Sequence, residues 1–348
     1  MKCKFPLLLI FIALLKTTTA QTYNDPVSYM NAISTAETEM NANYMTYLSA
    51  VAHGRRARKV EKLRLKTVEG IQECKSKILS LPYYKGDASL KKSSVSYIDV
   101  VYYVFNDDYA KLVNKEEIAE QSFDEMQAYI LLKEKIAQKL GEAFNKMHDS
   151  TLQFAYRNNV KLTSQRSELG DKMEIANKLQ HYTNDMFLVF FKCNWMDSKL
   201  TEAINKKKIN DAEQARNSLI KYAEEGLQAL KSDSLRALSG DANLAIACAQ
   251  VLNFYKSMAQ NDVPKMTDMF IKEDNFSKLK KTFEAKSPKD RTKQDVDAYN
   301  KSVNDINVAV NTYNNTNNNV NKKRTEILTN WDNSQNQFND VHMPYFKK

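Results

Sequence analysis

Glycine and proline are scarce in this chain, with seven and six in 348 residues. Both residue types interrupt regular structure, because glycine favours turns and proline lacks the backbone N–H that a helix needs. A chain with so few interruptions consists mostly of long regular segments. Between the breaks, apolar residues recur at steps of three, four and seven, which is typical of helices and predicts an all-α fold.

Motifs of the common catalytic and metal-binding classes are lacking as well. The sequence has no P-loop, GxGxxG, GxSxG, HExxH, CxxC pair or EF-hand loop. None of its histidines has Glu three positions before it, so the Glu-x-x-His pattern of di-iron bundles is missing. A pair of catalytic carboxylates has no motif, but it needs positioning loops, and this chain has little loop. We therefore expect no enzymatic activity, no cofactor and no metal site.

Long apolar runs are lacking except at the N-terminus. The run at 5–15 is too short for a membrane span, which takes roughly 20 residues. It follows Lys2 and Lys4 and precedes small residues suited to cleavage before Gln21, which predicts a secretory signal peptide over 1–20. The early cysteine, Cys3, precedes the run, so we expect no lipoprotein. The predicted location is the periplasm or the cell surface, with no transmembrane segment in the mature chain.

Cysteine is rare in the predicted mature chain, which keeps Cys74, Cys193 and Cys248. An odd number without close pairs is not a disulfide scaffold. Each cysteine lies in an apolar helical stretch, which favours small residues of the core. A bridge between Cys193 and Cys248 is the alternative in an oxidising envelope.

Two sequence fragments occur twice. EGIQECKS at 69–76 returns as EGLQALKS at 225–232, and GDASL at 86–90 returns as GDANL at 240–244. The two spacings nearly agree, which indicates an internal duplication. We predict two tandem four-helix bundle units, at 21–160 and 161–348.

Helical periodicity predicts the members of each unit. The first unit has predicted helices at 26–53, 57–80, 87–113 and 121–158. The second has predicted helices at 171–204, 209–235, 241–262 and 290–338, with a short insertion bracketed by Pro264 and Pro288. Such long helices favour elongated bundles with coiled-coil-like packing. The last segment is rich in asparagine, a poor helix former, so a disordered tail is its alternative.

Basic residues cluster between the first and second helix of each unit. The clusters consist of Arg55, Arg56, Arg58 and Lys59, and of Lys206, Lys207 and Lys208. One hypothesis is a pair of anion-binding tips for a phosphate-bearing envelope polymer or lipid headgroups. The simpler interpretation is a solvated turn, whose cations are favoured by the dipole of the preceding helix. The net charge of +9 is mild for this length, and export argues against nucleic acid as a partner.

Aromatic side chains crowd two of the predicted helices. They are Tyr97, Tyr102, Tyr103, Phe105 and Tyr109 in the third helix, and Phe187, Phe190, Phe191 and Trp195 in the fifth. The two helices could meet across the interface between the units. Ordinary packing is the favoured interpretation, and a ligand pocket is the alternative.

Several longer strings of the sequence resemble one protein family. They are TYLSAVAHGRRARKVEKLR at 46–64, FNDDYAKLVNKEEIAEQSFDEMQAYI at 105–130, KYAEEGLQAL at 221–230, and the stretch 270–304. The family consists of poorly characterised exported bacterial proteins, named as surface proteins after a leptospiral member. The resemblance implies an envelope location and a helical build, and it carries no catalytic or binding residues.

These observations lead to one expected function and one alternative. We expect a non-enzymatic binding or structural protein of the bacterial cell envelope. The alternative is a periplasmic protein that binds a small molecule or a polymer in a cleft between the two helical units.

Overall fold

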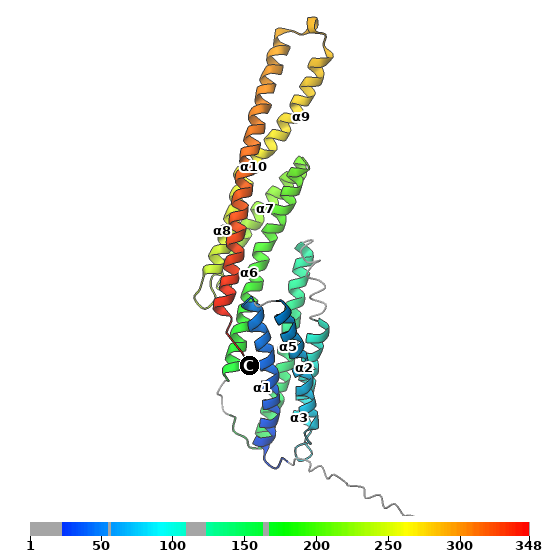
Figure 1. The fold of residues 1–348 in the computed structure, drawn as a ribbon, viewed down its shortest axis with the longest axis vertical. Coiled ribbons are helices and arrows are strands. Elements are labelled where there is room, and N and C mark those ends of the chain that lie inside the picture. Colours follow the sequence, from blue (N-terminus) through cyan, green and yellow to red (C-terminus); the bar gives the residue numbers. More distant parts are fainter. Residues whose placement is uncertain (1–22, 55–56, 109–122, 163–166, 348) are drawn as a thin grey trace, which may run out of the picture.

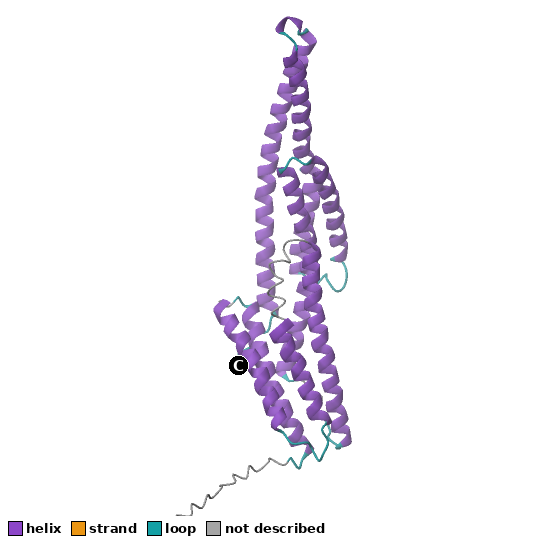
Figure 2. Ribbon diagram, turned by 90° about the vertical axis from the view of Figure 1, so that its right-hand side faces the viewer, coloured by secondary structure: helices purple, strands orange, loops and turns teal. Residues whose placement is uncertain are grey.

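The computed structural model describes residues 23–54, 57–108, 123–162 and 167–347. Over these residues the protein is all-α and forms no β-strand, only two isolated bridges within turns. The helices run close to one long axis, so the molecule is elongated (Figures 1 and 2). The predicted fold class is therefore confirmed at the level of an all-α protein.

The first group of helices forms one end of the molecule. It consists of α1 (Pro26–Ala52), α2 (Ala57–Ser80), α3 (Ser89–Tyr103) and α5 (Phe123–Arg157). Helix α1 begins where Asp25 accepts a hydrogen bond from the Ser28 backbone N–H and Pro26 occupies the first turn. Both are common start signals of a helix. Helix α3 continues into a π-helical turn, Val104–Asp108, which is called η1 here.

The second group extends from the first toward the other end (Figure 1). It consists of α6 (Glu168–Asn205), α7 (Ile209–Ala229), α8 (Asn243–Asn261), α9 (Val263–Ala285) and α10 (Lys293–His342). Helix α10 has 50 residues, about 75 Å at 1.5 Å per residue. It stays helical to His342, which confirms the helix over a disordered tail. Its buried Trp331 and Phe338 supply the packing that asparagine does not.

The segment between Pro264 and Pro288 was predicted as a short insertion, but most of it is helix α9. Pro264 lies in the first turn of this 23-residue helix, where the missing N–H of proline is harmless. Pro264 therefore starts a helix and does not interrupt one. After the 3-10 turn η2 (Pro288–Asp290), Thr292 and Asp295 form a capping box that begins α10. The α9–α10 hairpin projects beyond all other helices (Figures 1 and 2).

The buried apolar residues form two cores, and α5 contributes to both. Ile136 and Phe154 belong to the core of the first group, whereas Met126 and Ile130 belong to that of the second. Helix α6 likewise packs on α1 before it enters the second group. The two groups are therefore continuous along α5 and α6.

Two turns, 154 positions apart, have the same geometry. In the first, the Asp87 N–H donates to the Tyr84 carbonyl at 2.8 Å, and in the second, Asp241 donates to Leu238 at 2.9 Å. The two central residues of each turn have positive φ, and the second of them is Gly86 (86°) or Gly240 (89°). Two positive φ angles are the mark of a type I′ turn, which favours glycine.

Matching aromatic pairs close the ends of the two groups beside these turns. The Tyr29 ring of α1 lies 5.7 Å from the Phe154 ring of α5. The Tyr182 ring of α6 lies 5.5 Å from the Phe338 ring of α10. In each group the first helix thus meets the last helix through a tyrosine and a phenylalanine.

The C-terminal segment ties α10 back to α1. The Tyr345 ring stacks on His53 at 3.6 Å, and the His53 Nδ1 lies 2.6 Å from an Asp340 carboxylate oxygen. The Phe346 N–H donates to the Ser49 hydroxyl at 3.1 Å. The hydrogen bonds from His53 and from the Tyr345 hydroxyl hold the pKa of Asp340 below its usual value. This segment gives the two groups a second connection besides α5 and α6.

Candidate functional site

The space between α1 and α5 is hollow over part of its length. Beyond the Tyr29–Phe154 pair, the two helices hardly touch within the described residues. A cavity of about 540 Å³ opens between them, and the N-terminal part of α6 covers it. Small-molecule sites in proteins commonly measure about 300–1,000 Å³. The cavity therefore has the size of a ligand site.

The floor of this cavity is apolar and buried. It is formed by side chains from α1, α2, α3, η1 and α5 that belong to the first core, namely Met40, Ile71, Val101, Phe105 and Ile136. Three rings extend the apolar surface, since the partly buried Tyr44 and Tyr97 and the exposed Phe144 also line it. The Tyr97 and Phe144 rings meet edge to face at 6.1 Å. Burial raises the pKa of Tyr97, so its hydroxyl stays protonated.

The rim of the cavity is polar and rich in side-chain amides. Asn41 of α1 and Asn177, Gln180 and Asn184 of α6 are among the lining residues. The buried Asn184 accepts a hydrogen bond from the Lys133 ammonium at 3.1 Å. An amide both donates and accepts hydrogen bonds. The cavity thus combines an apolar interior with a rim that can bind a polar group.

A second cavity, of about 440 Å³, lies next along the same helices. Met147 and His148 of α5 and Glu37 of α1 line it. His148 stacks on Phe144 of the larger cavity at 6.0 Å. Glu37 precedes Asn41 of the larger cavity by about one helical turn. The two cavities therefore follow one another along the seam between α1 and α5.

Glu37 is the unusual acid of this seam. Burial raises its pKa to about 7, and the nearby Ser94 hydroxyl offsets part of that rise. Within the described residues, neither the Glu37 Oε1 nor the Ser94 Oγ has a hydrogen-bond partner of good geometry. Isolated buried carboxylates are unfavourable, so such a group is protonated or acquires a partner. Glu37 is thus able to change its charge near neutral pH.

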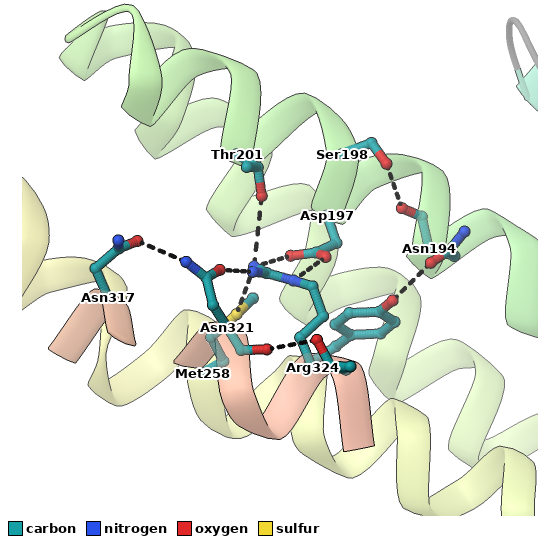
Figure 3. Close-up of polar contacts among 10 residues, drawn as sticks. Asn194, Asp197, Ser198, Thr201, Met258, Asn317, Asn321 and Arg324 are labelled. Atoms are coloured by element: carbon teal, nitrogen blue, oxygen red, sulfur yellow. Dashed lines mark hydrogen bonds and ion pairs between the residues drawn. The ribbon is translucent and has the colours of Figure 1, made fainter. Parts of the chain in front are cut away.

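The second group contains a buried polar cluster of another kind (Figure 3). The Asp197 carboxylate receives two hydrogen bonds from the Arg324 guanidinium, at 2.7 and 2.9 Å, and its side chain is only 5% exposed. Burial raises the pKa of Asp197, and Arg324 offsets part of the rise. The hollow beside Arg324 measures only about 20 Å³. This cluster joins α6 to α10 and leaves no room for a ligand.

The first predicted basic tip lies only partly within the described residues. Arg55 and Arg56 lie outside the described residues, and Arg58 and Lys59 are exposed in the first turn of α2. That turn is also the positive end of the α2 dipole.

The three lysines of the second tip each have a carboxylate partner. Lys206 pairs with Glu202, Lys207 with Glu273 and Lys208 with Asp211. Exposed pairs of this kind are weak, yet they lower the positive charge of the turn. The C-terminal ends of α1 and α6 point toward the same end of the long axis (Figure 1).

The two predicted aromatic clusters do not meet. Tyr97 and Phe105 line the cavity, whereas Phe190 packs in the second core, where it stacks on Trp331 at 4.5 Å. Helix α6 presents earlier residues to the cavity, among them Met173 and Asn177. The reason is the length of α6, which places its aromatic part beyond the first group. Tyr109 lies outside the described residues.

The remaining predicted features concern cysteines, metals and membrane spans. Cys74, Cys193 and Cys248 are buried and free, so Cys193 and Cys248 are not bridged. No cluster of three or more metal-ligating side chains occurs within the described ranges. No helix among the described residues is long and apolar enough to cross a membrane.

The sequence interpretation missed Glu37, although a signal was present. The apolar stripe of helix 26–53 runs through Tyr29, Ile33, Met40 and Tyr44. Glu37 falls within that stripe, four positions after Ile33. An acid at a core-facing position is the pattern that marks it.

No family model, curated protein or solved structure matches this chain, so the resemblance to exported surface proteins stays a prediction.

Proposed function

We propose that this is an exported, non-enzymatic binding protein of the bacterial cell envelope. Its ligand is a small amphipathic molecule that lies in the cavity between α1, α5 and α6. The observation that carries the proposal is the cavity of about 540 Å³ with a buried apolar floor and an amide-rich rim. Export rests on the signal peptide predicted for 1–20, and the non-enzymatic role rests on the lack of catalytic motifs.

The energetics of packing favour an occupied cavity. Residues such as Ile71, Val101 and Ile136 belong to a core, yet they border open space. These three side chains are at most 6% exposed, so the apolar surface that leaves water on binding is mainly that of the ligand, and it contributes roughly 25 cal/mol for each Å² buried. A ligand with an apolar body would gain this free energy, and the rim amides would orient its polar end.

A repeated plan of two four-helix units is part of the proposal. The matching fragments of the sequence, the two turns with equal geometry and the two tyrosine–phenylalanine pairs all support it. In this plan α9 is an extension of the second unit. The cavity then lies between the first unit and the first helix of the second.

A structural role at the envelope is the second candidate. The projecting α9–α10 hairpin favours it, because a long two-helix arm extends the reach of a protein (Figure 1). The basic tips would serve such a role as contacts for anionic polymer or lipid headgroups.

Binding of a neutral naphthylamine dye, whose fluorescence rises in apolar surroundings, tests the proposed function. The wild-type protein should bind the dye. Leu140→Trp, which adds bulk inside the cavity, should weaken binding at least about tenfold, because the ring occupies the ligand space. Ile246→Trp is the matched control, since Ile246 is exposed on α8. The absence of dye binding, or equal binding by the two variants, would contradict the proposal.

A further inference from the structure

The surroundings of Glu37 contain polar and titratable groups but no cation bound to it. Burial raises the pKa of Cys74 of α2 and of Tyr97 of α3, and the nearby Glu37 charge adds to the rise of each. His148 of α5 and Lys161 line the same cavity, but neither forms an ion pair with Glu37. Among the residues that the structure describes, the carboxyl therefore has no charge partner.

The second group fills the corresponding place with aromatic rings. Tyr29 of α1 and Tyr182 of α6 mark the same register, and Glu37 and Phe190 follow them by the same number of residues. Phe190 stacks on Trp331, which is 1% exposed. Packing at this position therefore favours a large apolar side chain. A carboxyl there disrupts the packing and provides a negative charge inside a cavity.

We propose that Glu37 binds the cationic nitrogen of an amphipathic amine whose apolar body lies along the seam between α1 and α5. This inference rests on the proposed function and adds the chemical class of the ligand. Ammonium and carboxylate form charge-assisted hydrogen bonds, which are stronger than neutral ones. The Tyr97 and Phe144 rings line the adjoining cavity and offer aromatic faces to the cation and to the chain beside it.

The charge state of Glu37 makes this binding depend on pH. The carboxyl must be ionised to pair with an ammonium, and its pKa is raised to about 7 in the absence of ligand. A bound cation favours the ionised form and lowers that pKa. Affinity for an amine should therefore fall as the pH drops below about 7, whereas affinity for a neutral alcohol of equal length should not change.

Displacement of the naphthylamine dye by chain-matched probes tests the inference. We expect octylamine to displace the dye from the wild-type protein about tenfold better than octanol, and octanoate to be the weakest. Glu37→Gln should bind octylamine and octanol equally, with octanol affinity unchanged. Glu39→Gln is the control, because Glu39 lies on the same helix and pairs with Lys77 at the surface.

The outcomes separate this inference from the proposed function. If the dye does not bind, both fail. If the dye binds but octylamine has no advantage over octanol, or Glu37→Gln keeps that advantage, the inference is wrong and the proposed function stands. Carbon-13 NMR of the glutamate carboxyls adds a readout without any variant. Octylamine should lower the titration midpoint of one carboxyl from about 7, and an unchanged midpoint would overturn the inference.

Discussion

The two groups of helices differ most in how the first helix packs against the last. In the second group, Phe190 of α6 and Trp331 of α10 stack at 4.5 Å. At the corresponding register of the first group, α1 carries Glu37 and α5 carries Met147, and both border a cavity. An aromatic stack in one group is thus replaced by a carboxyl and a flexible thioether in the other.

A second pair of positions shows the same difference. Asp197 and Arg324 form a buried bidentate ion pair in the second group (Figure 3). The corresponding residues of the first group are Tyr44 and Leu140, which line the larger cavity. If the two groups share the repeated plan proposed above, that plan can give either a closed core or an open seam. A few side chains on the first and last helices decide which of the two forms.

Arg324→Ala should have the largest effect on stability, because it breaks the buried ion pair between α6 and α10. It leaves Asp197 buried without its partner, which typically destabilises a protein by about 3–5 kcal/mol. Urea unfolding, followed by circular dichroism, measures the loss. The double variant Asp197→Leu with Arg324→Met should regain much of that stability, because it removes both charges. A loss under about 1 kcal/mol for Arg324→Ala would show that the pair does not hold α6 to α10.

Trp331→Ala should make the second group resemble the first. Loss of a buried tryptophan opens a cavity and costs about 3 kcal/mol or somewhat more. Met147→Ala is the matched change on α5, and it should cost less, because Met147 already borders open space. Trp331→Ala should also gain a second binding site for the naphthylamine dye. Equal destabilisation by the two variants would mean that the first seam is as well packed as the second.

Much of the fold follows from sequence periodicity, but the cavity does not. The helix predicted at 26–53 agrees with α1 almost to the residue, because Asp25 and Pro26 are local start signals. Pro264 is also a start signal, but the same residue is compatible with a break, so α9 was missed. The predicted helix over 209–235 ends at Ala229, since helix ends depend on local turns that periodicity does not report.

The site was harder to predict, because it depends on the distance between helices far apart in the sequence. Tyr97 and Phe105 were noticed as aromatic residues, and both line the cavity. Their partners were predicted on the wrong part of α6, because packing register across helices is not encoded in the pattern of one helix. Glu37 was visible as an acid in an apolar stripe, but only the structure shows that no cation of the described ranges pairs with it.

Glu37→Gln should have the smallest effect on stability, and its sign depends on pH. The pKa of Glu37 is raised to about 7 from a usual value of 4.5, so the folded protein binds a proton more tightly than the unfolded chain. The stability of the wild-type protein therefore falls as the pH rises from about 4.5 to about 7 and then stays level. Glu37→Gln removes this fall, so the variant should be more stable than the wild type at about pH 8, by at most roughly 3 kcal/mol, and close to it at about pH 4.

Urea unfolding at these two pH values measures that difference, with Glu39→Gln as the control at the surface. A Glu37→Gln variant that is less stable at both values would mean that the carboxylate holds α1 to its neighbours. It would then resemble Asp197 in the second group, where the charge has a partner. A gain confined to the higher pH would show instead that the first seam sacrifices stability to keep a charge in its cavity. Such a sacrifice is characteristic of a residue retained for binding.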